Sequence, residues 1–160
     1  KAPWDFDALG NPVHVSRGFA NSDFGPFLTQ DLFSYDTSEQ AAEVLGFVHS
    51  EFDCGEWIEE EPDTGMELLY HVEEFDFPAL GDETAALSIS VSAVFDEEAS
   101  LQRPTDAQSR DPFDVLTAQT IMIRHGNRFA YINAVEYFGA GDVDVEALAT
   151  RAAEKLESGE

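Results

Sequence analysis

The chain has one cysteine, two lysines and no long apolar run, and each scarcity excludes a class of protein. Cys54 has no second cysteine to form an internal disulfide, and no Cys/His grouping surrounds it, so structural zinc and dithiol redox chemistry lack ligands. No stretch approaches the roughly 18 apolar residues of a membrane-spanning helix. Because 8 Lys and Arg stand against 33 Asp and Glu, the net charge is -25. Nucleic acid and anionic membrane surfaces are therefore not expected partners, since phosphate binding needs cations.

The acidity has three explanations, and the composition leaves them open. Proteins of halophiles carry dense carboxylates to stay hydrated in salt, secreted proteins of high-GC bacteria drift toward acidic composition, and nucleic-acid mimics place carboxylates where phosphates would lie. None of these implies disorder. A hydrophobic content of 43% and 13 phenylalanines supply a core for one domain of this length.

Residues 1–26 show little periodicity and mix aromatic residues with Gly, Pro, Asn and Asp. We therefore predict an extended N-terminal arm over residues 1–26, followed by a single domain over residues 27–158. Four aromatic residues of the arm are candidates for contacting a protein partner: Trp4, Phe6, Phe19 and Phe24.

Alternation and capping signals predict the elements of the domain. A first strand ends near Tyr35, and Thr37 with Gln40 forms a capping box ahead of an amphipathic helix. Two strands then flank a Pro-Asp-Thr-Gly turn, and residues 83–95 alternate apolar residues with serines. After a polar stretch, a hairpin turns at residues 125–127 and a terminal helix closes the chain. The order β-α-β-β-β-β-β-α predicts an α+β fold, with an antiparallel sheet and two main helices packed on it.

Two short stretches add a resemblance to known proteins. Leu-Gly-Asp-Glu at residues 80–83 opens a strand, and Ile-Arg-His-Gly-Asn at residues 123–127 turns a hairpin. With the first helix ending near Cys54 and a terminal helix, the chain resembles actinobacterial cell-envelope lipoproteins. These are similar to extracellular sensor domains of bacterial Ser/Thr kinases and to PsbP-like α/β/α sandwiches. The resemblance covers residues 27–158 and implies an exported, membrane-tethered, non-enzymatic domain. The chain departs from it in lacking paired cysteines and a lipid-bearing cysteine at its start.

No catalytic set or cofactor motif is evident. The four histidines are widely spaced, and neither Gly-x-Ser-x-Gly nor His-Glu-x-x-His occurs. An EF-hand-like start at Asp5 lacks its third ligand and its closing glutamate. We therefore predict no enzyme activity, no metal site and no cofactor. Four aromatic residues of the domain are candidates for lining an apolar pocket between helix and sheet: Trp57, Tyr70, Phe75 and Phe77.

The function predicted from these observations is an extracellular or cell-envelope accessory or interaction domain that docks on a larger protein complex. Membrane association is expected only through a removed or absent anchor. One alternative is a sensor or carrier domain that holds a small apolar or cationic ligand between helix and sheet. A weaker alternative is an acidic nucleic-acid mimic.

Overall fold

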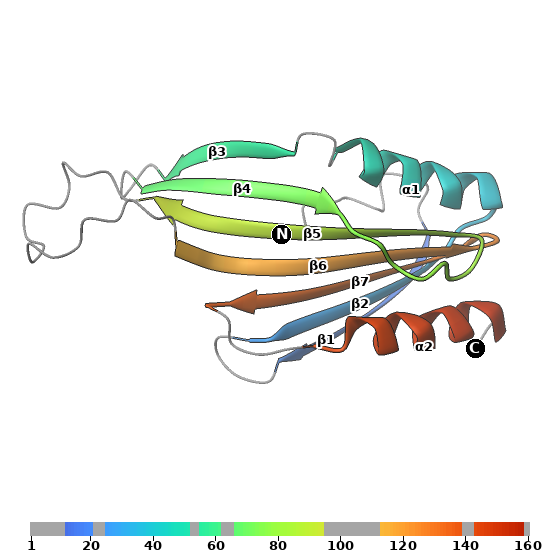
Figure 1. Ribbon diagram of the computed structural model, residues 1–160. Helices are drawn as coiled ribbons and strands as arrows, with labels where there is room; N and C mark the ends of the chain where they lie inside the picture. The colour runs from blue at the N-terminus through green and yellow to red at the C-terminus, as the bar shows by residue number, and fades with distance from the viewer. Residues whose placement is uncertain are drawn as a thin grey trace, which may run out of the picture.

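The computed structural model describes residues 12–20, 25–51, 55–61, 66–94, 113–138 and 143–158. These residues form seven strands and two helices (Figure 1): β1 (Val13–Ala20), β2 (Phe27–Ser34), α1 (Ser38–Glu51), β3 (Glu56–Glu61), β4 (Met66–Glu74), β5 (Glu83–Val94), β6 (Phe113–His125), β7 (Arg128–Tyr137) and α2 (Val145–Ser158). The predicted arm residues Trp4, Phe6 and Phe24, and Cys54, lie outside the described residues.

The seven strands form one antiparallel sheet in the order β1-β2-β7-β6-β5-β4-β3. From β3 to β7, each strand pairs with the next strand in the sequence. β2 instead pairs with β7, and this pairing places Ser34 opposite Arg128. Within the described part of the chain, β1 and β3 are the two edge strands. The sheet therefore has one edge built from the start of the chain and one from its middle.

The helices cover opposite faces of the sheet, both near the end where β6 turns into β7 (Figure 1). Successive residues of β5 show this, because side chains alternate between the faces of a strand. Ala85 and Leu87 belong to the core under α1, whereas Ala86 belongs to the core under α2. The end of the sheet away from this hairpin is left without helical cover by α1 and α2 (Figure 1).

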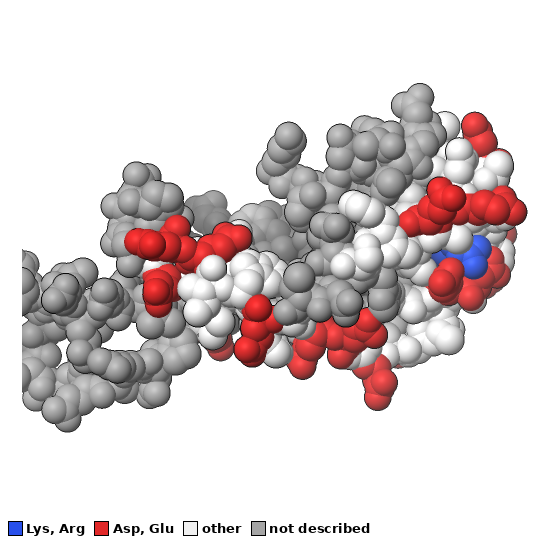
Figure 2. Space-filling model, turned by 90° about the horizontal axis from the view of Figure 1, so that it is seen from above, with Lys and Arg blue, Asp and Glu red and all other residues white. Residues whose placement is uncertain are grey.

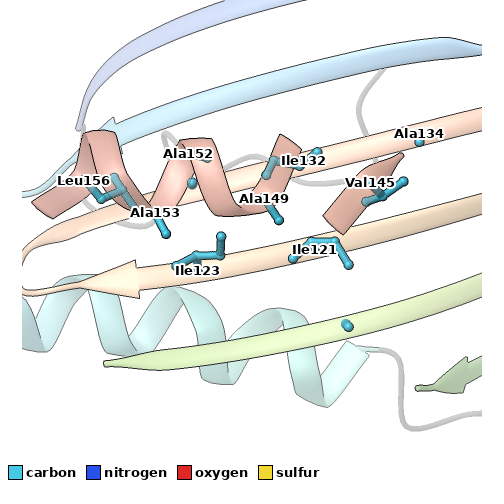
Figure 3. Packing of buried hydrophobic residues seen from close by; sticks show 11 residues of the cluster. Ile121, Ile123, Ile132, Ala134, Val145, Ala149, Ala152, Ala153 and Leu156 are labelled. Carbon is cyan, nitrogen blue, oxygen red and sulfur yellow. The ribbon is translucent and has the colours of Figure 1, made fainter. Parts of the chain in front are cut away.

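The larger core lies between α2 and the central strands. Figure 3 shows Val145, Ala149 and Ala152 of α2 facing isoleucines of β6 and β7. Ile121 and Ile123 have no exposed surface. Small alanines on the helix let it approach the sheet closely, and each buried isoleucine stabilises the fold by about 1.5–3 kcal/mol.

Short sequence motifs determine where the two helices begin and where β6 turns into β7. The capping box before α1 is confirmed. The backbone N–H of Gln40 donates to Thr37 Oγ1 at 3.3 Å, and the backbone N–H of Thr37 donates to the side-chain oxygen Oε1 of Gln40 at 3.2 Å. The β6–β7 turn is also confirmed, with Gly126 at φ 60° between paired strands. At α2, the Ala147 amide donates to Asp144 Oδ1 at 2.9 Å, which makes Asp144 the N-cap.

The predicted α+β fold is wrong, because the described chain is mainly β. Strand residues outnumber helical residues by more than two to one, and residues 13–20, predicted to belong to an arm, add a seventh strand. Two helices of 14 residues each cover only part of strands that reach 12 and 13 residues, so the predicted PsbP-like helix packing is not observed. Antiparallel strands are joined by turns and need no helical crossover, so they can extend beyond the part of the sheet that the helices cover.

Candidate functional site

The aromatic residues predicted to line one pocket form two separate pairs. Trp57 of β3 stacks on Tyr70 of β4, with ring centroids 4.9 Å apart, on the sheet face that α1 covers. Phe75 and Phe77, in the connector after β4, meet edge to face at 5.9 Å and pack against the α2 core. The structure therefore does not bring the four residues together.

The predicted partner-binding residue Phe19 lies on the edge strand β1. Its side chain is 58% exposed, and Val13 and Val15 on the same strand are 74% and 55% exposed. By the pairing register with β2, these three side chains and Arg17 lie on the face of the sheet that α2 covers. Exposed apolar side chains in a row on an edge strand are a feature that a folded domain usually avoids.

A groove lies between this strand and α2. It consists of two adjoining cavities of about 290 Å³ and 340 Å³, which share Val15, Leu32 and Lys155. We call it the α2–β1 groove and define it by its lining residues: Val13, Val15, Arg17, Gln30, Leu32, Phe33, Ser34, Arg128, Lys155 and Leu156. Its apolar lining comes from the two strands and from the last turn of α2.

The lining of the α2–β1 groove is basic although the protein is strongly acidic. The described residues include five basic side chains, and three of them, Arg17, Arg128 and Lys155, line the groove together with no Asp or Glu. Arg128 Nη1 donates to the Leu156 carbonyl at 2.8 Å, at the C-terminal end of α2. No described carboxylate lies within ion-pair distance of Arg17 or Lys155. The groove thus has cations available to an anionic group.

The side of the molecule that carries α1 differs in charge from the α2–β1 groove. Figure 2, which views the molecule from the α1 side, shows acidic side chains along the described surface and one small basic patch. The α2–β1 groove lies on the other face of the sheet. A long-range field that repels anions therefore coexists with a local site that attracts them.

A third cavity, of about 320 Å³, lies beside the N-terminal end of α2. Its polar lining comes from Ser88, Thr117, Gln119 and Glu136. Glu136 is the single ionisable side chain among the described residues that line it. Within the described residues no group of three or more His, Cys, Asp or Glu side chains is placed to hold a metal ion.

The two short stretches that carry the family resemblance contact each other and serve structure. The Gly126 amide donates to Asp82 Oδ2 at 2.7 Å, the Asp82 amide donates to the Arg124 carbonyl at 2.8 Å, and Arg124 Nε donates to Glu83 Oε2 at 2.9 Å. The hydrogen bond from Gly126 lowers the pKa of Asp82, and the charges of His125 and Arg124 lower it further. These contacts fix the start of β5 against the β6–β7 turn.

Sequence reasoning named Phe19 as a candidate but did not predict the groove, because the basic residues of the groove are distant in the chain. One local signal was present. β1, with the sequence Val-His-Val-Ser-Arg-Gly-Phe-Ala, is the only described strand without Asp or Glu. In a chain where about one residue in five is acidic, a strand that has apolar and basic residues but no acidic ones marks a different kind of surface.

Comparison with known proteins supports the fold. No family model matches the chain, and no curated protein matches it in sequence. Among solved structures, the fold is similar to that of the extracellular domain of PknH from Mycobacterium tuberculosis. The TM-score is 0.56 and the sequence identity 12%, with 96% of this chain and 68% of that chain covered. The predicted likeness to extracellular sensor domains is confirmed at this level only, and the comparisons give no support to the lipoprotein and PsbP parts of it.

Neither of the described helices, α1 and α2, is long and apolar enough to cross a membrane.

Proposed function

We propose that this protein is a non-enzymatic extracytoplasmic interaction or sensor domain, and that β1 with the α2–β1 groove is its binding surface. The similarity to the extracellular domain of PknH supports the compartment and the class of domain. The observation that carries the proposal is the groove itself. Three basic side chains and an exposed row of apolar residues gather at one edge of a protein whose net charge is -25.

The basic side chains there have no structural role that would explain all of them. Arg128 caps the end of α2 and Lys155 lies in its last turn, where a cation offsets the helix dipole, but Arg17 has neither role and no described ion-pair partner. Selection for solubility alone favours acidic side chains here, as on the face in Figure 2. A binding surface accounts for both the cations and the exposed valines, since an interface combines apolar contact with polar groups at its rim.

A sensor or carrier of small ligands is the second candidate, and the same groove favours it. The groove lies between a helix and the sheet, where the sequence predicts a ligand site. The four aromatic residues predicted to line that site do not line the groove. A cationic ligand does not suit this lining, because Arg17 and Lys155 would repel it. An apolar ligand with an anionic group suits it better.

The test replaces Phe19 by the photocrosslinking residue p-benzoylphenylalanine in the protein's own organism. Phe47 of α1, which is 40% exposed on the other side of the sheet, receives the same replacement as the matched control. We expect a discrete adduct at Phe19 and none at Phe47. A protein adduct supports the interaction domain, and an adduct with the mass of a small molecule supports the sensor or carrier. No adduct at Phe19, or equal adducts at both positions, would contradict the proposal.

A further inference from the structure

The two edges of the sheet differ in their protection against further strand pairing. β3 has the sequence Glu-Trp-Ile-Glu-Glu-Glu, so four of its six side chains are acidic. Charged side chains on an edge strand discourage the addition of another strand. On β1, all 8 residues are exposed and none is acidic. Within the described residues β1 pairs with β2 alone, which leaves one side of its backbone open to pairing.

The side chains of β1 define what an added strand would meet. Val13, Val15, Arg17 and Phe19 point to the α2 face, because alternate residues of a strand share a face. A strand added alongside β1 places its own alternate side chains next to these four. The groove lies on the same face, with Lys155 lining both of its cavities together with Val15.

We propose that β1 binds an extended segment of a partner protein as an eighth, antiparallel strand of the sheet. Alternate side chains of that segment are apolar opposite Val13, Val15 and Phe19, and one is a carboxylate opposite Arg17 and within reach of Lys155. Backbone hydrogen bonds supply affinity, and the alternate side chains supply specificity, as in other cases of strand addition. This inference rests on the proposed function and names its partner.

Charge complementarity decides in favour of an acidic segment. Arg17 and Lys155 have no described carboxylate within ion-pair distance, so an incoming carboxylate displaces no ion pair among the described residues. The net charge of -25 acts against any anion at long range. At physiological salt this repulsion is screened beyond about 8 Å, whereas a contact pair is screened much less. If an acidic segment binds more tightly than a neutral one, its binding site is therefore the basic groove, because the average surface of this acidic protein repels anions.

The probe is the end-blocked octapeptide Ser-Val-Thr-Glu-Thr-Val-Ser-Val, whose glutamate falls opposite Arg17 in antiparallel register with β1. The control peptide has glutamine in place of glutamate. Binding to the whole protein is measured at physiological salt by fluorescence anisotropy. We expect the glutamate peptide to bind about two- to fivefold more tightly, the range typical of one exposed ion pair. Equal binding, or tighter binding of the glutamine peptide, overturns the choice of an acidic segment.

Two further peptides test strand pairing itself. One carries N-methyl groups on the amides of its odd positions, the other on those of its even positions. In an antiparallel strand, alternate residues direct their amides to the same side. We expect one methylated peptide to lose binding more than about tenfold, because several hydrogen bonds are removed, while the other binds as before. If both lose binding or neither does, the segment is not held as an added strand.

Protein variants then locate the site. Arg17→Gln is expected to abolish the preference for the glutamate peptide, whereas Ala79→Glu makes the same change in net charge on an exposed connector and should preserve it. Loss of the preference in both variants overturns the role of Arg17. Urea unfolding of each variant confirms that it is folded.

Failure of this inference differs from failure of the proposed function. A protein adduct at Phe19 with no binding of the octapeptides refutes the acidic strand and leaves the interaction domain intact. Self-association of the protein that depends on β1 and that the peptide does not displace also refutes it, because a second copy would then occupy the edge. Absence of both the adduct and peptide binding refutes both proposals.

Discussion

Replacing Gly81 by alanine tests how closely the start of β5 approaches the β6–β7 turn. Gly81 has φ 69°, and a Cβ built there would lie 2.5 Å from the Arg124 carbonyl oxygen. That oxygen belongs to the backbone of a central strand, and it already accepts a hydrogen bond from the Asp82 amide at 2.8 Å. It therefore has little freedom to move without disturbing the pairing of β5 with β6.

The expected cost has two parts. Left-handed backbone at a residue with a Cβ costs about 1–2 kcal/mol, and overpacking against a fixed neighbour costs about 1–3 kcal/mol. Their sum predicts that Gly81→Ala lowers the free energy of unfolding by about 2–5 kcal/mol. For a chain of this length each kcal/mol corresponds to about 2–4 °C in melting temperature.

The matched control is Gly126→Ala in the neighbouring turn. Gly126 has φ 60°, but a Cβ there would meet nothing within 4 Å, so only the backbone cost applies, about 1–2 kcal/mol. Urea unfolding of both variants, followed by far-UV circular dichroism in one buffer, gives the two free energies. If Gly81→Ala costs no more than Gly126→Ala, the close approach to Arg124 is refuted.

Two further predictions concern single polar contacts. Asp144→Ala removes the side chain that caps α2 at Ala147 and should lower the free energy of unfolding by about 1 kcal/mol, while Glu154→Ala, exposed on the same helix, should change it by less than about 0.5 kcal/mol; equal effects would contradict the capping role. The folded-state pKa of Asp82 lies below its ordinary value of 3.8, so its stabilising contribution is present above pH 3.8 and is lost as the pH falls through the folded pKa. Asp82→Asn should therefore unfold at lower urea than the parent at pH 6, and the difference should shrink as the pH falls below 3.8; a gap independent of pH would refute the linkage.

Local signals were sufficient where neighbours in sequence make the structure. Thr37 and Gln40 lie three residues apart, and their hydrogen bonds depend on that spacing alone. The turn at Gly126 is equally local, as is the apolar stripe of α2 from Val145 to Leu156. Of the family resemblance, the comparison with PknH supports only the likeness to extracellular sensor domains.

Local signals failed where a residue's role depends on distant parts of the chain. β1 has no buried residue, so no alternation of burial distinguishes it from an extended arm. Its place in the sheet comes from its pairing with β2, which in turn lies beside β7. The α+β prediction was wrong for a related reason. The fold class depends on how many residues the strands contain relative to the helices, and the two helices cover only part of the strands.

The sequence by itself determined the acidity, the lack of a cysteine pair, the capped helices and the hairpin, because each depends on composition or on residues within a few positions. Only the tertiary structure decided the order of the strands and the two faces of the sheet. It alone brings Arg17, Arg128 and Lys155 to one groove. These three residues come from an edge strand, a central strand and the last helix, and no spacing along the chain relates them. Pairing between strands distant in sequence, and the packing of α2 across them, made that surface.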